Sequence, residues 1–291
     1  MKNNRFVYLV LLPIFILLAV FFVLPIVGGF AISFFDYNPL RAINHFIGFE
    51  NFGKLMSDKI FLKSTANTLI FVGITVTLNI FLTLVLAQLV SMLPWPKFRS
   101  FFRVIFFMPC VAPLIASSVV WGGLYATKYG LINNMLKTFF GISPVNWLGT
   151  ASYVMPAIII FTLWADIGYN IILFSAGMDG IPADFYEAAE IDGAGMVKKF
   201  FYITLPLLGR TVSFVVAMTI ISHFQMFAQF QVLAKLGGPE NSGNVLTYYI
   251  YKTAFQTKDM GYASAIAVVL FLLIMIVTII QQRLNRVEWG Y

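Results

Sequence analysis

Long apolar runs constrain this chain more than any other feature of its sequence. A helix that crosses about 30 Å of hydrocarbon needs roughly 20 mostly apolar residues. Only 11% of the 291 residues are charged, against roughly 25% in soluble domains, which is too few to cover a water-facing surface. The sequence therefore predicts an all-α membrane protein with six transmembrane helices, near Phe6–Phe34, Asn67–Val90, Phe102–Ala126, Ala151–Ala176, Thr211–Leu233 and Tyr262–Gln282.

The first run indicates a retained helix, because it is far longer than the 7–15 apolar residues of a secretory signal. Lys and Arg crowd the short segments that contain Lys97–Arg103 and Lys198–Arg210, and such charges favour the cytoplasmic side. With six spans, both termini are then expected in the cytoplasm. The expected organisation is a first helix and outer loop at 1–64, a five-helix core at 65–285 and a cytoplasmic tail at 286–291.

The distribution of the basic residues and the small number of cysteines and histidines argue against two classes of function. The net charge is +7, and Cys110 is the one cysteine. Basic residues in the loops of a membrane protein face anionic lipid head groups, and no basic stripe with interleaved aromatic residues predicts nucleic-acid binding. One cysteine and two distant histidines supply neither a disulfide nor a set of metal ligands. We therefore expect no nucleic acid and no metal site.

The longest predicted cytoplasmic loop, Gly177–Gly209, has a pattern typical of a helix–turn–helix. Pro182 suits a first helical turn, acidic residues follow it near the positive end of the helix dipole, and Gly193 suits a C-terminal cap. One interpretation is an amphipathic connector that lies on lipid. Interfacial helices are usually basic on their polar face, whereas this one is acidic, which favours docking of another protein.

A fixed pattern in this loop resembles the EAA loop of ABC importer permeases. It reads Glu187-Ala188-Ala189, three residues, Gly193, nine residues, Ile203, one residue, Leu205-Pro206. Tyr129–Asn133, Gly237-Gly238-Pro239 and Gly261–Ala265 are similar to the carbohydrate-uptake branch, which includes the larger maltose permease subunit and shorter oligosaccharide and glycerol-phosphate permeases. The resemblance implies a type I importer permease fold, with the coupling loop at 181–206.

The resemblance also implies partners and a division of labour. Two ATPase subunits would use ATP and magnesium, and this chain would bind no cofactor and carry no catalytic residue. A second homologous permease, an extracytoplasmic sugar-binding protein, lipid and the sugar would complete a system in the cytoplasmic membrane of a prokaryote. The implied ATPase-coupling residues are Glu187, Ala188, Ala189, Asp192, Gly193, Ile203, Leu205 and Pro206.

A phosphate-loop pattern at Gly48–Lys54 does not alter this assignment. The next residue is Leu55, where the phosphate loop needs a Ser or Thr to hold magnesium. ATP hydrolysis is therefore expected in another chain.

Polar residues in the fourth and fifth predicted spans indicate a substrate pathway. Asp166 is the only carboxylate expected within a span, and an ionisable group at that depth usually faces a cavity. Residues three and four positions apart share a helix face, and the resemblance to maltose-type permeases adds Ala165. Stacking of a sugar on Trp164 or Tyr169 is expected. The predicted pathway residues are Thr162, Trp164, Ala165, Asp166, Tyr169, Asn170, Thr219, Ser222, His223 and Gln225.

Other interpretations of these residues remain open at this stage. The polar groups could instead hold helices together by interhelical hydrogen bonds. A secondary transporter or channel for a polar solute would also use an intramembrane charge, although only Asp166 is available. An intramembrane enzyme would need a catalytic constellation, and none emerges from the sequence.

Overall fold

The computed structural model of the protein describes residues 4–284 and is mainly helical. Five helical segments are long and apolar enough to cross a membrane, and a sharply bent pair of helices could supply a sixth. The predicted tail at 286–291 lies outside the described residues. By length and composition, the five spans are Tyr8–Ile32, Lys59–Ser91, Ala151–Asp179, Gly209–Leu233 and Met260–Leu284.

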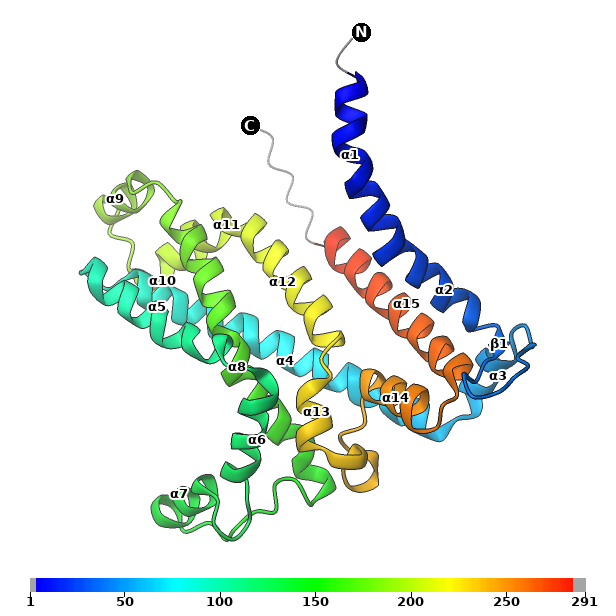
Figure 1. The fold of residues 1–291 in the computed structure, drawn as a ribbon. Coiled ribbons are helices and arrows are strands. Elements are labelled where there is room, and N and C mark those ends of the chain that lie inside the picture. Colours follow the sequence, from blue (N-terminus) through cyan, green and yellow to red (C-terminus); the bar gives the residue numbers. More distant parts are fainter. Residues whose placement is uncertain (1–3, 285–291) are drawn as a thin grey trace. The chain divides into compact units, whose positions relative to one another are not determined.

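The chain divides into two compact units, each of which is described by itself (Figure 1). The first contains the described residues up to Leu62 together with Leu246–Leu272, and the second contains Lys63–Val245 and the described residues from Leu273. The elements of the first unit are α1 (Asn4–Leu18), α2 (Leu24–Ile32), β1 (Phe35–Asp36), β2 (His45–Phe46), α3 (Glu50–Ser57), α14 (Leu246–Tyr251) and the beginnings of α4 (Lys59–Ser91) and α15 (Met260–Leu284).

The second unit holds the remaining helices and the ends of α4 and α15. It also contains a π-helical turn at Phe200–Thr204 and 3-10 turns at Lys235–Gly237 and Pro239–Asn241, whereas the π-helical turns at Ala19–Val23 and Lys252–Gln256 belong to the first unit. The helices confined to the second unit are α5 (Pro96–Val111), α6 (Leu114–Leu124), α7 (Leu131–Phe140), α8 (Ala151–Asp179), α9 (Asp184–Ile191), α10 (Met196–Lys199), α11 (Leu205–Leu207), α12 (Gly209–Phe224) and α13 (Ala228–Leu233).

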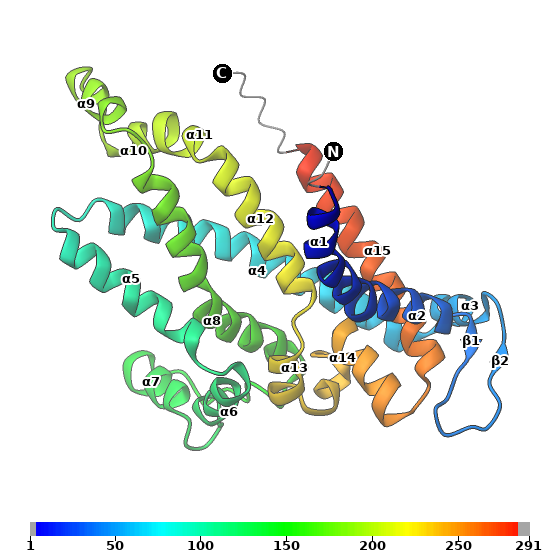
Figure 2. The same cartoon turned by 45° about the horizontal axis from the view of Figure 1, so that its top comes forward.

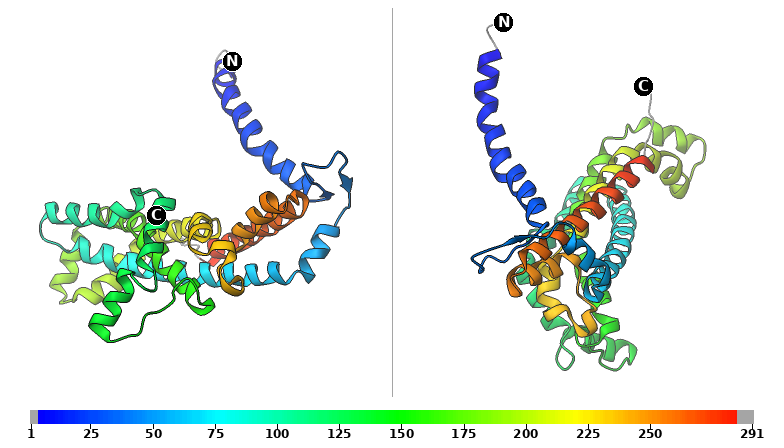
Figure 3. Two further views of the ribbon diagram at one scale, coloured as in Figure 1. Left: turned by 60° about the horizontal axis from the view of Figure 1, so that its bottom comes forward. Right: turned by 90° about the vertical axis from the view of Figure 1, so that its right-hand side faces the viewer.

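A short β-hairpin in the first unit has no counterpart in the sequence prediction. Phe35 pairs with Phe46 and Asp36 with His45 in an antiparallel register, and Arg41 in the connecting loop pairs with Asp36 at 2.7 Å. Each strand has only two residues, so no alternation of apolar and polar positions could reveal it. In the same unit, α1 projects away from the other elements of the unit (Figure 3), whereas Phe30 in α2 packs against Phe271 in α15 with a centroid distance of 5.7 Å. The side chains of the most apolar stretch of α1 and α2 are not buried.

The half-buried carboxylate of Asp58 ties three helices of the first unit together. Asp58 precedes α4 and caps it, because its Oδ1 accepts hydrogen bonds from the backbone N–H groups of Ile60 and Phe61. Its Oδ2 accepts the hydroxyl groups of Tyr249 in α14 and Tyr262 in α15, each at 2.6 Å. Burial alone would raise the pKa of Asp58, but the hydroxyl and backbone hydrogen bonds outweigh burial and hold this pKa below its ordinary value of 3.8.

We predict that Asp58→Asn destabilises the protein in a pH-dependent way. Because the pKa of Asp58 is lowered by folding, its contribution is present above pH 3.8 and is lost as the pH falls through the lower folded pKa. The difference in unfolding temperature between wild type and Asp58→Asn should therefore narrow below about pH 4. Tyr249→Phe should cost about 1–3 kcal/mol at neutral pH, whereas Tyr129→Phe, at a residue 78% exposed, should cost almost nothing. If the difference in unfolding temperature between wild type and Asp58→Asn stayed the same at low pH, the stabilising role of the ionised Asp58 would be contradicted.

The core of the second unit lies where α4, α8 and α12 meet. Ala87, Phe174 and Val215 are fully buried there, with Ile171, Met178 and Leu208 packed beside them. Next to this apolar cluster, the Asn170 side-chain amide donates hydrogen bonds to Asn79 Oδ1 at 2.7 Å and to Thr219 Oγ1 at 2.9 Å. The three helices therefore share one apolar cluster and one hydrogen-bonded junction.

The predicted single helix Phe102–Ala126 is wrong. The structure ends α5 at Val111 and begins α6 at Leu114, with a bend of 94° between them (Figure 2). The cause is Pro113, which disfavours a helical conformation for the preceding residue; Ala112 is accordingly extended, at φ −70° and ψ 138°. The predicted helix Thr211–Leu233 is also interrupted, at residues 225–227, where no proline or glycine marks the break.

A close helix crossing depends on Gly168 in α8. A Cβ atom placed on this glycine would overlap the carbonyl oxygen of Phe106 in α5. Small residues allow this kind of backbone approach between membrane helices. α5 can therefore lie against α8 only while residue 168 carries no side chain.

We predict that Gly168→Ala separates α5 from α8 and lowers the unfolding temperature of the protein in mild detergent. Overpacking of this kind typically costs 1–3 kcal/mol. Gly73→Ala is the matched control, because Gly73 lies inside α4 and a Cβ there would meet nothing within 4 Å. Equal unfolding temperatures for the two variants, measured by intrinsic fluorescence, would rule out the tight crossing.

Candidate functional site

The EAA-like loop forms the predicted helix–turn–helix at one end of the second unit, and α7 lies at the opposite end (Figure 1). α9 begins at Asp184 rather than in the turn that contains Pro182, so the proline precedes the helix. α10 is a short helix, and the chain continues through the π-helical turn Phe200–Thr204 into α11 and α12. All fixed positions of the pattern thus fall on one continuous stretch of chain between α8 and α12.

The turn between α9 and α10 has a well-defined Schellman cap. Gly193 adopts φ +71°, its N–H donates to Glu190 O at 3.0 Å, and Ala194 N–H donates to Ala189 O at 2.8 Å. Glycine is favoured at this left-handed position because it has no Cβ. The predicted role of Gly193 as a C-terminal cap therefore agrees with the geometry.

Two side-chain contacts hold this loop in shape. Lys199 Nζ in α10 pairs with Glu190 Oε1 in α9 at 2.6 Å. Tyr186 Oη in α9 hydrogen-bonds with Thr204 Oγ1 at 2.9 Å, and Thr204 is fully buried. None of these four residues was among the predicted coupling residues. Their polar side chains gave no periodic signal, and the EAA pattern leaves their positions unspecified.

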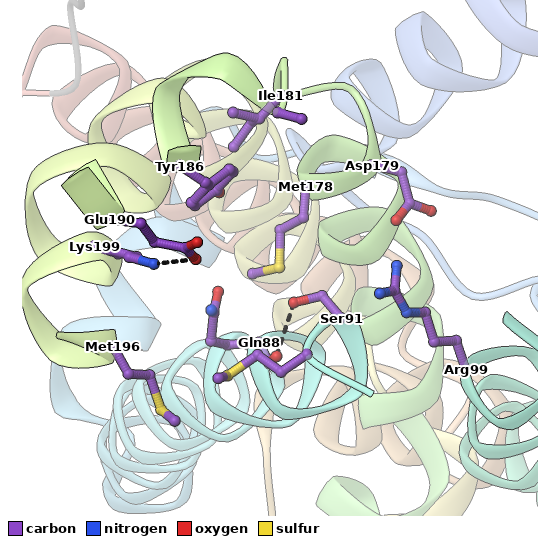
Figure 4. Close-up of a pocket in the computed structure, with 12 residues that line it drawn as sticks. Gln88, Ser91, Arg99, Met178, Asp179, Ile181, Tyr186, Glu190, Met196 and Lys199 are labelled. Atoms are coloured by element: carbon purple, nitrogen blue, oxygen red, sulfur yellow. Dashed lines mark hydrogen bonds and ion pairs between the residues drawn. The ribbon is translucent and has the colours of Figure 1, made fainter. Parts of the chain in front are cut away.

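A pocket of about 600 Å³ lies on the inner side of α9 (Figure 4). Tyr186, Glu190 and Lys199 face it from the loop, and Gln88 and Arg99 face it from the end of α4 and the beginning of α5. Of the predicted coupling residues, Ala189, Ile203 and Leu205 are half-buried, and the others are exposed: Glu187, Ala188, Asp192, Gly193 and Pro206.

The helix–turn–helix of α9 and α10 also exposes large apolar side chains to its surroundings. Ile191 is 89% exposed, and Phe185 and Val197 are also exposed. Large exposed apolar residues that cluster on one surface mark interaction sites. Acidic Glu187 and Asp192 lie on the same short helix and turn, so the surface combines apolar and negatively charged groups.

A second cavity, of about 670 Å³, lies among α5, α6, α8, α12 and α13. It contains five of the ten predicted pathway residues. Its lining includes residues from the break between α12 and α13, which shows that the break helps to open this space. The predicted residues that line it are Thr162, Ala165, Asp166, Ser222 and Gln225.

Asp166 is anchored at the wall of this cavity by a buried histidine. Its Oδ2 lies 3.0 Å from Nε2 of His223, and the other ring nitrogen of His223 lies 3.0 Å from Oγ1 of Thr75 in α4. The side chain of His223 is fully buried, whereas that of Asp166 is 32% exposed. His223 thus lies behind the wall, and Asp166 presents its carboxyl group to the cavity.

Buried polar atoms without a partner also mark this cavity. Oγ1 of Thr162 and both amide atoms of Gln229 are buried and make no hydrogen bond, and both residues line the cavity. Thr162 is 2% exposed and Gln229 1% exposed. An unpaired buried polar group costs about 1–3 kcal/mol, so these two residues weaken the packing of the helices beside the cavity.

The other predicted pathway residues lie elsewhere. Asn170 and Thr219 form the junction with Asn79, as the interhelical alternative requires. Trp164 packs against Trp121 with a centroid distance of 5.3 Å, and Tyr169 is 50% exposed. Neither lines the cavity. Ser117 and Gln229 do line it, and neither was among the predicted residues; an amide in an apolar run was the available signal for Gln229.

The phosphate-loop pattern occupies a helix. Gly53 and Lys54 lie inside α3, and Lys54 pairs with Glu50 one turn earlier at 3.3 Å. A phosphate loop needs backbone N–H groups that converge in a loop before a helix, which this segment does not provide.

Comparison with known proteins identifies the chain's family. The family described as "Binding-protein-dependent transport system inner membrane component" matches residues 79–287. The chain belongs to this family. It is thus a multi-pass membrane component of a transport system, which disfavours the channel and enzyme alternatives.

Similar proteins match along almost the full length of the chain. The probable ABC transporter permease protein YurN of Bacillus subtilis is 32% identical over 97% of this chain and 96% of its own length. The trehalose/maltose transport system permease protein MalF of Thermococcus litoralis is 34% identical over 98% of this chain and 95% of its own. A crystal structure of a bacterial ABC transporter that imports the acidic polysaccharide alginate has the same fold, with a TM-score of 0.86, 21% identity and coverage of 99% of this chain and 98% of that chain.

We predict that Gly193→Ala disturbs the loop locally without unfolding the protein. A non-glycine residue at φ +71° is strained by roughly 1 kcal/mol, and the space around Gly193 is open, so no clash adds to this strain. Hydrogen exchange at residues 184–199 should rise about fivefold while the unfolding temperature stays within a few degrees of wild type. Gly195→Ala, at a residue with negative φ and open space, is the control. Equal exchange in both variants would show that the cap does not stabilise the loop.

Proposed function

We propose that this chain is the membrane-spanning permease subunit of an ATP-binding-cassette importer for a sugar. The observation that carries the proposal is the capped helix–turn–helix at 184–199, with its exposed Ile191 and its acidic neighbours Glu187 and Asp192. Such a surface between two spans suits a partner with an apolar cleft and basic groups. The names of similar proteins, which transport trehalose and maltose among other sugars, support the choice of cargo.

The partners proposed for the system follow from this division of labour. Two ATPase subunits hydrolyse ATP with magnesium and bind the loop at 181–206 on the cytoplasmic side, where both termini of the chain also lie. A second, different permease subunit faces the cavity around Asp166. An extracytoplasmic binding protein delivers the sugar on the opposite side, and the complex resides in the inner membrane of a prokaryote.

The loop can transmit motion because it is braced on both sides of its turn. The Glu190–Lys199 ion pair and the Tyr186–Thr204 hydrogen bond connect α9 to the segment that enters α12. α12 carries Ser222 and His223, which line or support the cavity. Movement of α9 by a bound ATPase would thus be passed to α12, which contributes to the sugar pathway. Coupling between two sites requires that a ligand at one site changes the contacts at the other, and α12 provides this connection.

The test is isolation of the tagged chain from its native membrane in mild detergent, followed by identification of its partners. A second permease and an ATPase should co-purify, and Ile191→Glu should lose the ATPase, because the substitution places a charge in an apolar contact. Phe139→Glu is the matched control, since Phe139 is a similarly exposed apolar residue, 71% exposed, at the other end of the unit.

Transport provides the second measurement. Proteoliposomes with the complete complex and the binding protein should take up a labelled oligosaccharide only with ATP on the ATPase side, and Glu187→Lys should reduce this uptake at least tenfold. Full uptake by the chain alone, without ATP, would reject the proposal and favour a secondary transporter.

A further inference from the structure

The wall around Asp166 carries information about the charge of the transported sugar, which the family and the fold leave open. The alginate importer, of the same fold, carries an acidic polysaccharide. Among the described residues that line the cavity here, none is a lysine or an arginine, and Asp166 is the one carboxylate. The remaining polar lining consists of hydroxyl, thiol and amide groups.

The histidine behind the wall does not supply a cation to the cavity. The side chain of His223 has no exposed surface, and its two ring nitrogens are taken up by Asp166 and Thr75 at 3.0 Å each. An anionic group in the cavity would therefore find no cationic partner among the described residues that line it. It would instead face the carboxyl group of Asp166.

A neutral sugar fits the same groups without this penalty. A hydroxyl both donates and accepts hydrogen bonds, so sugar hydroxyls can donate to Asp166 and can exchange hydrogen bonds with the exposed side chains of Ser222 and Gln225. A uronic acid carboxylate only accepts hydrogen bonds when ionised. It can offer nothing to a second carboxylate, and an unpaired charge is costly to remove from water.

We propose that the cavity selects uncharged sugars over acidic sugars of the same shape, and that Asp166 sets this discrimination. The inference rests on the proposed function and deepens it, because it assigns a substrate class to the cavity. Ser222 and Gln225 offer hydrogen bonds to either class of sugar, whereas only Asp166 distinguishes between the two classes by charge.

The test compares one pair of ligands that differ only in charge. The first is the neutral oligosaccharide that the reconstituted complex imports best, and the second is the same sugar with its terminal C6 alcohol oxidised to a carboxylate. Binding of each is measured by saturation-transfer NMR on the detergent-solubilised permease and ATPase complex without the binding protein. This removes the selectivity of the binding protein from the comparison.

The neutral sugar should bind at least tenfold more tightly than its acid, and Asp166→Asn should reduce that ratio roughly tenfold, the effect of one like charge several ångströms away. Asp166→Glu should keep the ratio. Ser222→Ala should weaken the binding of both ligands by the same factor. Gln225→Lys, which adds a cation to the lining, should strengthen binding of the acid, and it keeps the proposal testable if Asp166→Asn does not fold.

Equal or tighter binding of the acid by wild type would overturn the inference, as would a ratio unaffected by both Asp166→Asn and Gln225→Lys. Either result would leave the proposed function intact if ATP-driven uptake of the neutral sugar persists. The proposed function itself would fail if the complete complex imported no sugar at all.

Discussion

Polar groups in a membrane protein must find their partners inside the protein, and this requirement organises the second unit. Hydrocarbon offers no hydrogen bonds, so unsatisfied groups are costly there. Asn170 meets the requirement through Asn79 and Thr219, which fixes three helices around one point. Thr162 and Gln229 do not meet it, and both lie at a cavity. The requirement is thus met by Asn170 but left open at Thr162 and Gln229, and also at Nδ2 of Asn79 within the junction itself.

The origin of these hydrogen-bond partners explains how far the site could be predicted from the sequence. Asp166 and Asn170 lie four positions apart on one face of α8, so helical periodicity assigned them a common role. Their hydrogen-bond partners are His223 for Asp166 and Asn79 and Thr219 for Asn170, which all belong to other apolar runs. No local pattern connects these residues to α8. The helices and the EAA-like loop could be predicted because composition and fixed spacing specify them, whereas the contents of the cavity depend on how the helices pack.

Of the two breaks between spanning helices, one could be predicted from the sequence and the other could not. Pro113 was visible in the sequence, and its effect on Ala112 accounts for the turn between α5 and α6. The break between α12 and α13 has no such marker, yet it places Gln225 and Gln229 at the cavity. In hydrocarbon, an interrupted helix is tolerated where it is buried or lines a polar space. The unmarked break therefore lies where such a space exists.

The ion pair between Glu190 and Lys199 limits how the EAA-like loop can vary among homologues. Both residues fall at positions that the EAA pattern leaves free, so each appears open to substitution when considered alone. Lys199 is only 18% exposed, however, and loss of Glu190 would leave its ammonium group without that partner. Divergence at these two positions should therefore be correlated, through reversed pairs or joint replacement by uncharged residues. The loop's freedom to diverge is smaller than its short motif implies.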